Sequence, residues 1–185
     1  VEELPLVFQQ AQANLKNKRL VEHEERERKE KTDMLFFGGA FAEDLEQLNK
    51  VLAADRRLTA NLPPLLIDGP TGAGKSTYAQ WIHANGPRKE QPFVALNCSA
   101  ISENLVESEL FGHEKGAFTD ASKSRIGLFE AADQGTLFLD EVASLSLAAQ
   151  SKLLLAIESG KIRRVGGSKD LSTNVRIIAA ANQDL

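Results

Sequence analysis

The chain has 185 residues, 42% of them hydrophobic and 26% charged, which fits one globular domain with a sizeable core plus an appended arm. Its formal net charge of −4 excludes an overall basic field for nucleic acid, so any DNA contact would be local or on residues outside this chain. The single cysteine, Cys98, excludes an internal disulfide, and no apolar run approaches the length of a membrane span, so we expect a cytoplasmic protein without membrane contact.

Residues 1–34 are predicted to form a charged helical arm. Residues 4–21 have scattered apolar positions typical of a moderately amphipathic helix, whereas residues 22–31 have no large apolar side chain. Acid–base pairs at i, i+4 spacing in the second stretch each favour a helix by about 0.2–0.5 kcal/mol. A signalling helix from a regulatory domain and a plain charged linker explain this arm equally well.

Residues 35–185 alternate helices with short apolar strands. We expect helices at about 42–58, 78–84, 102–110, 126–132 and 147–159, with Ser102 as an N-cap. Strands are expected at 65–68, 93–97, 136–139 and 175–180. Apolar strands that alternate with helices predict a parallel sheet covered on both faces. Residues 112–125 interrupt the pattern as an expected exposed loop or hairpin, and residues 161–174 are polar and basic with a turn at Gly166-Gly167.

The stretch GPTGAGKST fits the phosphate-loop pattern G-x-x-x-x-G-K-[ST] without a mismatch and lies between an expected strand and an expected helix. Its glycines allow a tight turn whose N–H groups form an anion cradle at a helix N-terminus. Lys75 would reach the β- and γ-phosphates, and the Ser76 hydroxyl would ligate Mg²⁺. A chance Gly-rich turn is the less favoured alternative. The residues predicted to bind nucleotide are Gly69, Pro70, Thr71, Gly72, Ala73, Gly74, Lys75, Ser76 and Thr77.

Asp140 and Glu141 end an apolar strand, at the edge where parallel sheets bind their ligands. Asp140 would hold Mg²⁺, directly or through water, and Glu141 would polarise the water that attacks the γ-phosphate. An apolar strand that ends in Asp-Glu is a weak signal alone, but with a complete phosphate loop it indicates hydrolysis of ATP or GTP.

Several further stretches resemble the central AAA+ ATPase domain of sigma-54-dependent transcription activators, the bacterial enhancer-binding proteins. The resemblance covers roughly residues 37–185, and the sequence ELFGHEKGAFT at 109–119 is its most specific part. The other matching stretches are 69–76, 96–98, 135–141, 164–167 and 175–176, together with Asn182. The resemblance implies a P-loop NTPase (AAA+) fold of the α/β class, a three-layer parallel sheet with helices on both faces.

The resemblance also implies roles for individual residues. Asn97 would restrain Glu141 until the partner is engaged, and Asn182 would act as a sensor of the γ-phosphate. Residues 161–170 would form a second loop that faces the pore of a hexameric ring. DNA would be bound through a C-terminal domain outside this chain, and ATP with Mg²⁺ would drive the remodelling of RNA polymerase that holds sigma-54. The loop expected to contact sigma-54 comprises Gly116, Ala117, Phe118, Thr119, Asp120 and Ala121.

Three departures from the family pattern bear on function. Asp120 stands where the family usually has a second Gly, and Ala181 stands where it often has Thr. The chain also ends before the arginine fingers, the fifth strand and the helical lid, so we expect an open edge at strand 65–68, weak nucleotide binding and very poor hydrolysis by this fragment alone. Because of Asp120, a second function stays possible, that of a nucleotide-gated regulator that does not drive sigma-54. A third, that of a chaperone-type AAA+ remodeller, is disfavoured by Phe118 in its glycine-flanked loop.

Other conspicuous residues have simpler expected roles. His113 lacks a second histidine at ligand spacing, so we expect a loop contact rather than a metal site. Cys98 and Trp81 are expected to be core side chains, with adenine stacking as the minor alternative for Trp81. Arg163 and Arg164 are expected in a solvated basic turn, with a DNA or partner contact as the alternative.

Overall fold

The structure is a computed structural model that describes residues 42–58, 62–119 and 121–182. The chain divides into two compact units, Val1–Glu43 and Asp44–Leu185, and nearly all described residues belong to the second. The predicted charged arm therefore lies outside the described residues. Within the described part, no helix combines the length and the apolar character needed to cross a membrane.

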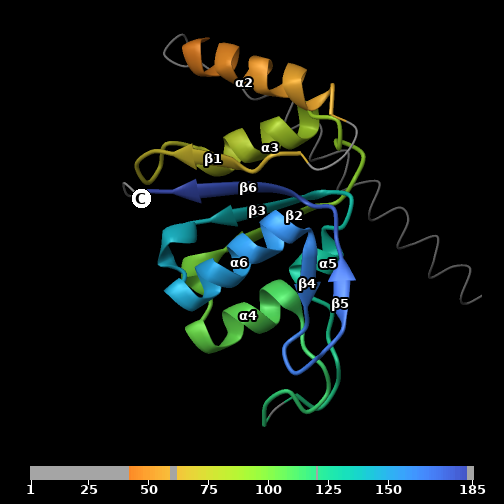
Figure 1. The fold of residues 1–185 in the computed structure, drawn as a ribbon. Helices are drawn as coiled ribbons and strands as arrows, with labels where there is room; N and C mark the ends of the chain where they lie inside the picture. Colours follow the sequence, from red (N-terminus) through yellow and green to blue (C-terminus); the bar gives the residue numbers. More distant parts are fainter. Residues whose placement is uncertain (1–41, 59–61, 120, 183–185) are drawn as a thin grey trace, which may run out of the picture. The chain divides into compact units, whose positions relative to one another are not determined.

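Four parallel strands form the central sheet, in the order β1-β6-β3-β2 (Figure 1). All side chains of β3 except the last, and all of β6 except one, are buried, because these central strands have helices on both faces. β1 is an edge strand in the described part of the chain, and its Leu66 is 52% exposed. The predicted parallel sheet is confirmed. Its strands are β1 (Leu65–Asp68), β2 (Phe93–Asn97), β3 (Thr136–Asp140) and β6 (Arg176–Ala181).

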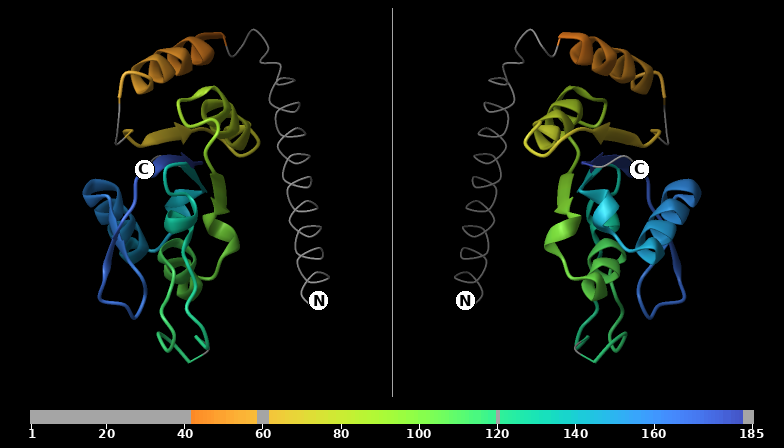
Figure 2. Two further views of the ribbon diagram at one scale, coloured as in Figure 1. Left: turned by 90° about the vertical axis from the view of Figure 1, so that its right-hand side faces the viewer. Right: turned by 90° about the vertical axis from the view of Figure 1, so that its left-hand side faces the viewer.

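Helices cover both faces of the sheet, as the three-layer prediction requires (Figures 1 and 2). One face packs against α2 (Ala42–Asp55) and α3 (Lys75–Asn85). The other face packs against α4 (Glu103–Phe111), α5 (Leu128–Ala131) and α6 (Leu147–Ser159).

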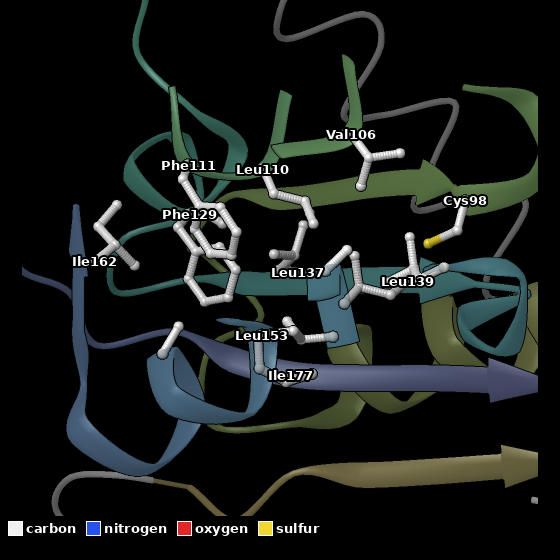
Figure 3. Packing of buried hydrophobic residues seen from close by; sticks show 14 residues of the cluster. Cys98, Val106, Leu110, Phe111, Phe129, Leu137, Leu139, Leu153, Ile162 and Ile177 are labelled. Atoms are coloured by element: carbon white, nitrogen blue, oxygen red, sulfur yellow. The ribbon is translucent and has the colours of Figure 1, made fainter. Parts of the chain in front are cut away.

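The larger hydrophobic core lies between the sheet and α4, α5 and α6 (Figure 3). Phe111 and Phe129 stack with ring centroids 5.5 Å apart, above Leu137 and Ile177 of the sheet. Each such side chain contributes about 1.5–3 kcal/mol when it is fully buried. On the opposite face, half-buried Trp81 packs against the smaller core, as expected of a core residue.

The element boundaries depart from the sequence predictions at several places. α3 begins at Lys75, three residues early, because Gly74 adopts the left-handed conformation (φ 81°) and the helix starts directly after it. Ser102 occupies the N-cap position of α4, but its side chain caps no backbone N–H group. Two short 3₁₀ helices were not predicted, η2 (Cys98–Ala100) and η3 (Val142–Ser144).

The basic stretch after α6 contains an antiparallel hairpin that was not predicted, β4 (Lys161–Arg163) with β5 (Asp170–Ser172). Each strand has only three residues, which is too short for a pattern of alternating apolar side chains to be recognised. Ile162 is the one buried side chain of β4, and it belongs to the larger core. Half-buried Leu171 of β5 packs against the same core, so the hairpin is attached by one apolar side chain from each strand and by the contacts of its loop.

Arg176 is the one charged residue of β6, and a buried ion pair explains its place in an apolar strand. Its Nη2 atom lies 2.8 Å from Oδ2 of Asp55, the last residue of α2, and the two side chains are only 4% and 3% exposed. Burial raises the pKa of Asp55 and lowers the pKa of Arg176, while each partner opposes the shift of the other. The pair joins α2 to the start of β6.

Candidate active site

The phosphate-loop residues join β1 to α3, in the strand–loop–helix arrangement that the motif requires. Gly72 and Gly74 have φ values of 84° and 81°, in the left-handed region that glycine adopts at no steric cost. The N–H group of Ala73 donates to the carbonyl of Pro70 at 3.1 Å and closes the turn. This conformation supports the predicted anion cradle at the N-terminus of α3.

The Lys75 ammonium lies inside the curve of this loop. The side chain is 8% exposed, and Nζ donates to the carbonyls of Gly69 at 2.9 Å and Pro70 at 3.1 Å. Because both of these acceptors are neutral, they leave the positive charge of the ammonium available to an anion. The loop therefore combines converging N–H groups with a fixed cation, which suits a polyphosphate.

Ser76 and Asp140 meet beside the loop. The Ser76 hydroxyl donates to Oδ2 of Asp140 at 3.5 Å, although the residues are 64 positions apart. Both side chains offer hard oxygen atoms, which Mg²⁺ prefers, and Mg²⁺ sites typically use one or two protein ligands together with water and phosphate oxygens. The described residues contain no cluster of three or more His, Cys, Asp or Glu side chains suited to a metal. The pair thus fits Mg²⁺ held jointly with a nucleotide, rather than a cage made by protein alone.

Glu141 follows Asp140 in an unusual backbone conformation. Its φ and ψ are 53° and 46°, which is left-handed and strained for a residue with a side chain. The N–H group of Glu141 donates to Oδ1 of Asp140 at 3.0 Å, and Ser144 donates to the Glu141 carbonyl from Oγ at 2.8 Å. These contacts fix the turn, and the other carboxylate oxygen of Asp140, Oδ2, faces Ser76.

The two predicted asparagines lie at the same edge of the sheet. Asn182 directly follows β6, and its Nδ2 atom donates to the Thr71 hydroxyl of the phosphate loop at 3.4 Å. Asn97 ends β2 opposite Asp140, but its Oδ1 atom accepts hydrogen bonds from Ser99, from the backbone N–H at 2.9 Å and from Oγ at 2.7 Å. These two hydrogen bonds direct the Asn97 side chain toward Ser99, and the restraint of Glu141 by Asn97 stays a prediction.

Ser99 was missed in the sequence analysis, although a local signal existed. An Asn whose side chain can accept from the residue two positions later favours an Asx turn, and Ser99 stands at that spacing. The intervening Cys98 is buried, as predicted, and burial raises the pKa of its thiol to about 11, with smaller contributions from the carboxylates of Asp140 and Glu141. A thiol of this kind is inert at neutral pH.

The predicted partner loop extends from α4 as a narrow hairpin-like segment (Figure 1). His113 and Arg125 exchange backbone hydrogen bonds at its base, and Gly116 donates to the carbonyl of Ala121 at 2.8 Å near its tip. Phe118 is 38% exposed, whereas Ala121 is 4% exposed and so is not presented at the surface. Asp120 lies outside the described residues.

The chain between β4 and β5 is hydrogen-bonded to the base of this loop. The Val165 N–H group donates to Gly112, and the Glu114 N–H group donates to Val165, at 2.9 and 3.0 Å. Arg164 forms ion pairs with Glu130 of α5 and with Glu114 of the loop. The expected solvated basic turn is therefore wrong for Arg164. Arg163 is exposed as expected, but it lies in β4 rather than in a turn and is paired with Asp170.

Comparison with known proteins identifies the family. A profile of the Sigma-54 interaction domain matches residues 41–185. The chain belongs to this family. It is 50% identical over 136 residues to the Nif-specific regulatory protein of Rhodobacter capsulatus, which covers 74% of this chain and 24% of that protein. It is 47% identical over 155 residues to the Psp operon transcriptional activator of Escherichia coli, which covers 84% and 46%.

Solved structures of NtrX from Brucella abortus share the fold of this sigma-54 interaction domain. One has a TM-score of 0.73 at 32% identity and covers 99% of this chain and 38% of that protein. A second, in complex with ATP, has a TM-score of 0.67 at 32% identity and covers 94% and 36%. The chain therefore spans less than half the length of each of these relatives.

Proposed function

We propose that this sigma-54 interaction domain is the ATP-hydrolysing part of a transcriptional activator that remodels sigma-54 RNA polymerase so that the promoter can open. The observation that carries the proposal is the meeting of Ser76 and Asp140 beside the Lys75 ammonium, which unites the two halves of a nucleotide site. Family membership supports a role in transcription, since one relative is the Psp operon transcriptional activator and another is a Nif-specific regulatory protein.

Each residue of the site has a part in binding or hydrolysis. The N–H groups of the loop and the Lys75 ammonium would bind the phosphates of ATP, as the ATP complex of NtrX leads us to expect. Ser76 and Asp140 would hold Mg²⁺, which when bound neutralises charge on the phosphates. Glu141 would accept a proton from the attacking water, and Asn182, linked to Thr71, would sense the γ-phosphate end of the loop.

The partner loop would convert hydrolysis into movement of sigma-54. Phe118 and Thr119 are exposed on that loop, which is where a side chain that contacts a partner must be. We further propose that the full-length protein works in the cytoplasm as a hexameric ring and binds DNA through another domain. A neighbouring subunit would then supply arginine fingers to each nucleotide.

A second function rests on Asp120. This carboxylate stands in a loop that would have to flex on contact, and its charge and its Cβ both restrict that movement. In this alternative the protein binds and hydrolyses ATP, but its nucleotide state controls another partner in transcription.

Capture of sigma-54 by the full-length protein tests the proposal. We expect capture only with ADP and a metal fluoride that mimics the transition state, and we expect Phe118→Ala to abolish it. Lys123→Ala, an exposed position on the returning limb of the same loop, is the matched control and should leave capture unchanged.

Two further variants separate binding from hydrolysis. Glu141→Gln should bind ATP and hydrolyse it at least about a hundredfold more slowly, because it removes the proton acceptor. Lys75→Ala should weaken ATP binding itself. Robust hydrolysis without capture of sigma-54 in any nucleotide state would overturn the motor function and leave the gated regulator.

A further inference from the structure

His113 lies against Phe118, the side chain expected to contact sigma-54. The two ring centroids are 5.0 Å apart, and the ring planes are inclined at 64°, an edge-to-face arrangement. Phe118 is nevertheless 38% exposed, so part of its ring remains available to a partner while the contact with His113 is made.

The His113 ring is fixed by hydrogen bonds at both of its nitrogen atoms. Nδ1 lies 2.7 Å from the hydroxyl of Ser108 on α4, and Nε2 lies 3.0 Å from the carbonyl of Lys123 on the returning limb of the loop. His113 and Ser108 are buried, at 9% and 6% exposure. Because Nε2 faces a carbonyl, it carries a proton, and Ser108 can pair with Nδ1 as either donor or acceptor. The ring plane is therefore set from two directions.

The backbone that carries His113 is also anchored to neighbouring segments, whereas the hydrogen bonds at the tip of the loop join residues of the loop to one another. His113 exchanges backbone hydrogen bonds with Arg125 at 3.0 and 2.9 Å, and a bridge joins it to Val165. Gly116, between His113 and Phe118, has a φ of 82°, and a β-carbon at this position would meet no atom within 4 Å. The Ala121 N–H group donates to the Phe118 carbonyl at 2.9 Å and places the backbone, but an exposed ring would still sample several rotamers unless another side chain held it.

We propose that His113 is a positioning residue that holds the Phe118 ring in the orientation in which it meets sigma-54. The inference rests on the proposed function. Holding the ring before contact lowers the entropy lost on binding, so affinity for the partner rises. An edge-to-face pair contributes enough that its loss corresponds to a roughly two- to tenfold weaker complex.

The contact itself can be observed apart from any partner. In the full-length protein, 4-fluorophenylalanine at position 118 should show a ¹⁹F chemical shift displaced by the His113 ring. We expect His113→Asn, which keeps a polar side chain but removes the ring, to move the resonance to the value of exposed 4-fluorophenylalanine. Lys123→Ala keeps the carbonyl that anchors Nε2 and should leave the resonance in place.

The affinity for sigma-54, measured with the transition-state mimic of ATP hydrolysis bound, then tests whether a fixed Phe118 ring strengthens binding. His113→Asn should weaken capture about two- to tenfold while ATP hydrolysis without sigma-54 stays unchanged, because His113 touches no residue of the nucleotide site. Should His113→Asn fail to fold, Ser108→Ala keeps the ring, removes one of its anchors and should weaken capture by a smaller factor in the same direction.

The outcomes distinguish this inference from the proposed function. An unmoved ¹⁹F resonance, unchanged capture, or capture that strengthens in His113→Asn would each overturn the positioning role alone. Failure of the wild-type protein to capture sigma-54 would overturn both. A purely structural role for His113 would lower thermal stability without moving the ratio of capture to hydrolysis.

Discussion

Arg164 donates hydrogen bonds to both carboxylate oxygens of Glu130, from Nε at 2.8 Å and from Nη2 at 2.7 Å. Its remaining terminal nitrogen donates to Glu114 at 3.1 Å. One guanidinium thus ties the end of β4 to α5 and to the base of the partner loop. The bidentate geometry explains why arginine, and not lysine, suits this position.

We expect Glu130→Gln to lower the free energy of unfolding by about 1.5–3 kcal/mol, because it removes a charged, half-buried partner of Arg164. Urea unfolding at neutral pH measures this change. Asp170→Asn is the matched control, since it breaks the exposed pair with Arg163 and should change stability by less than about 1 kcal/mol. Equal effects of the two variants would contradict the expectation that the ion pair of Arg164 stabilises the domain more than that of Arg163.

The stabilisation by Glu130 should also depend on pH. The hydrogen bonds from Arg164 hold the pKa of Glu130 below its ordinary value of 4.5. Because the folded pKa is depressed, the stabilisation is fully present above the unfolded pKa and is lost as the pH falls through the folded pKa. The difference between the wild-type protein and Glu130→Gln should therefore be constant near neutrality and should shrink at acidic pH below that ordinary value.

Asp55→Asn should destabilise the domain more strongly, by about 3–5 kcal/mol, because it leaves the Arg176 cation buried without its partner. Two nitrogens of Arg176, Nε and Nη1, already lack a hydrogen-bond partner in the described part of the chain. The double variant Asp55→Leu/Arg176→Met removes both charges and should recover most of the loss.

Glu46→Gln is the control for this ion pair. It breaks an exposed i, i+4 pair with Lys50 on the same helix, α2, and should change stability by less than about 0.5 kcal/mol. A double variant as unstable as Asp55→Asn would show that packing around Arg176, rather than its charge, governs this site.

The nucleotide site could be predicted from the sequence because its chemistry resides in short contiguous stretches. Lys75 and Ser76 follow the glycines that shape their loop, and Asp140 ends an apolar strand whose place in a parallel sheet is fixed by topology. Parallel pairing then brings Asn97 opposite Asp140 without any further information. Local pattern and global fold agree on where these residues lie, and their roles stay predictions.

The long-range ion pairs and the β4–β5 hairpin could not be predicted in the same way. Arg164 and Glu130 are 34 positions apart, and nothing in their local sequence marks them as partners. The charge of Arg176 in an apolar strand does signal a buried partner, but several acidic residues precede it, and only the structure selects Asp55. The β4–β5 hairpin depends on tertiary contacts more than on strand propensity.

Cys98 should resist alkylation in the folded protein. With a pKa of about 11 against an ordinary 9.0, its thiolate fraction at about pH 8 falls roughly a hundredfold, and burial slows access further. Iodoacetamide should therefore modify native protein at least about a hundredfold more slowly than urea-unfolded protein. Because the pKa is raised in the folded state, the contribution of the neutral thiol to folding stability is present below about pH 9. This contribution is lost as the pH rises through about 11. Rapid modification of the native protein would show that the β2–η2 junction opens.

Ser99→Ala should lower basal ATP hydrolysis of the full-length protein about two- to tenfold, if Asn97 restrains Glu141 as the family resemblance implies. The variant removes the Oγ donor at 2.7 Å that holds Asn97 toward Ser99, and one such hydrogen bond contributes about 0.5–1.5 kcal/mol. Asn97 is then freer to turn toward Glu141. Steady-state ATP turnover measures the effect, with Ser99→Thr expected to restore the rate because it keeps a hydroxyl. Ser151→Ala, which loses a similar serine hydrogen bond on α6, is the control. A turnover that rises in Ser99→Ala would mean that the bond to Ser99 holds Asn97 in its restraining position.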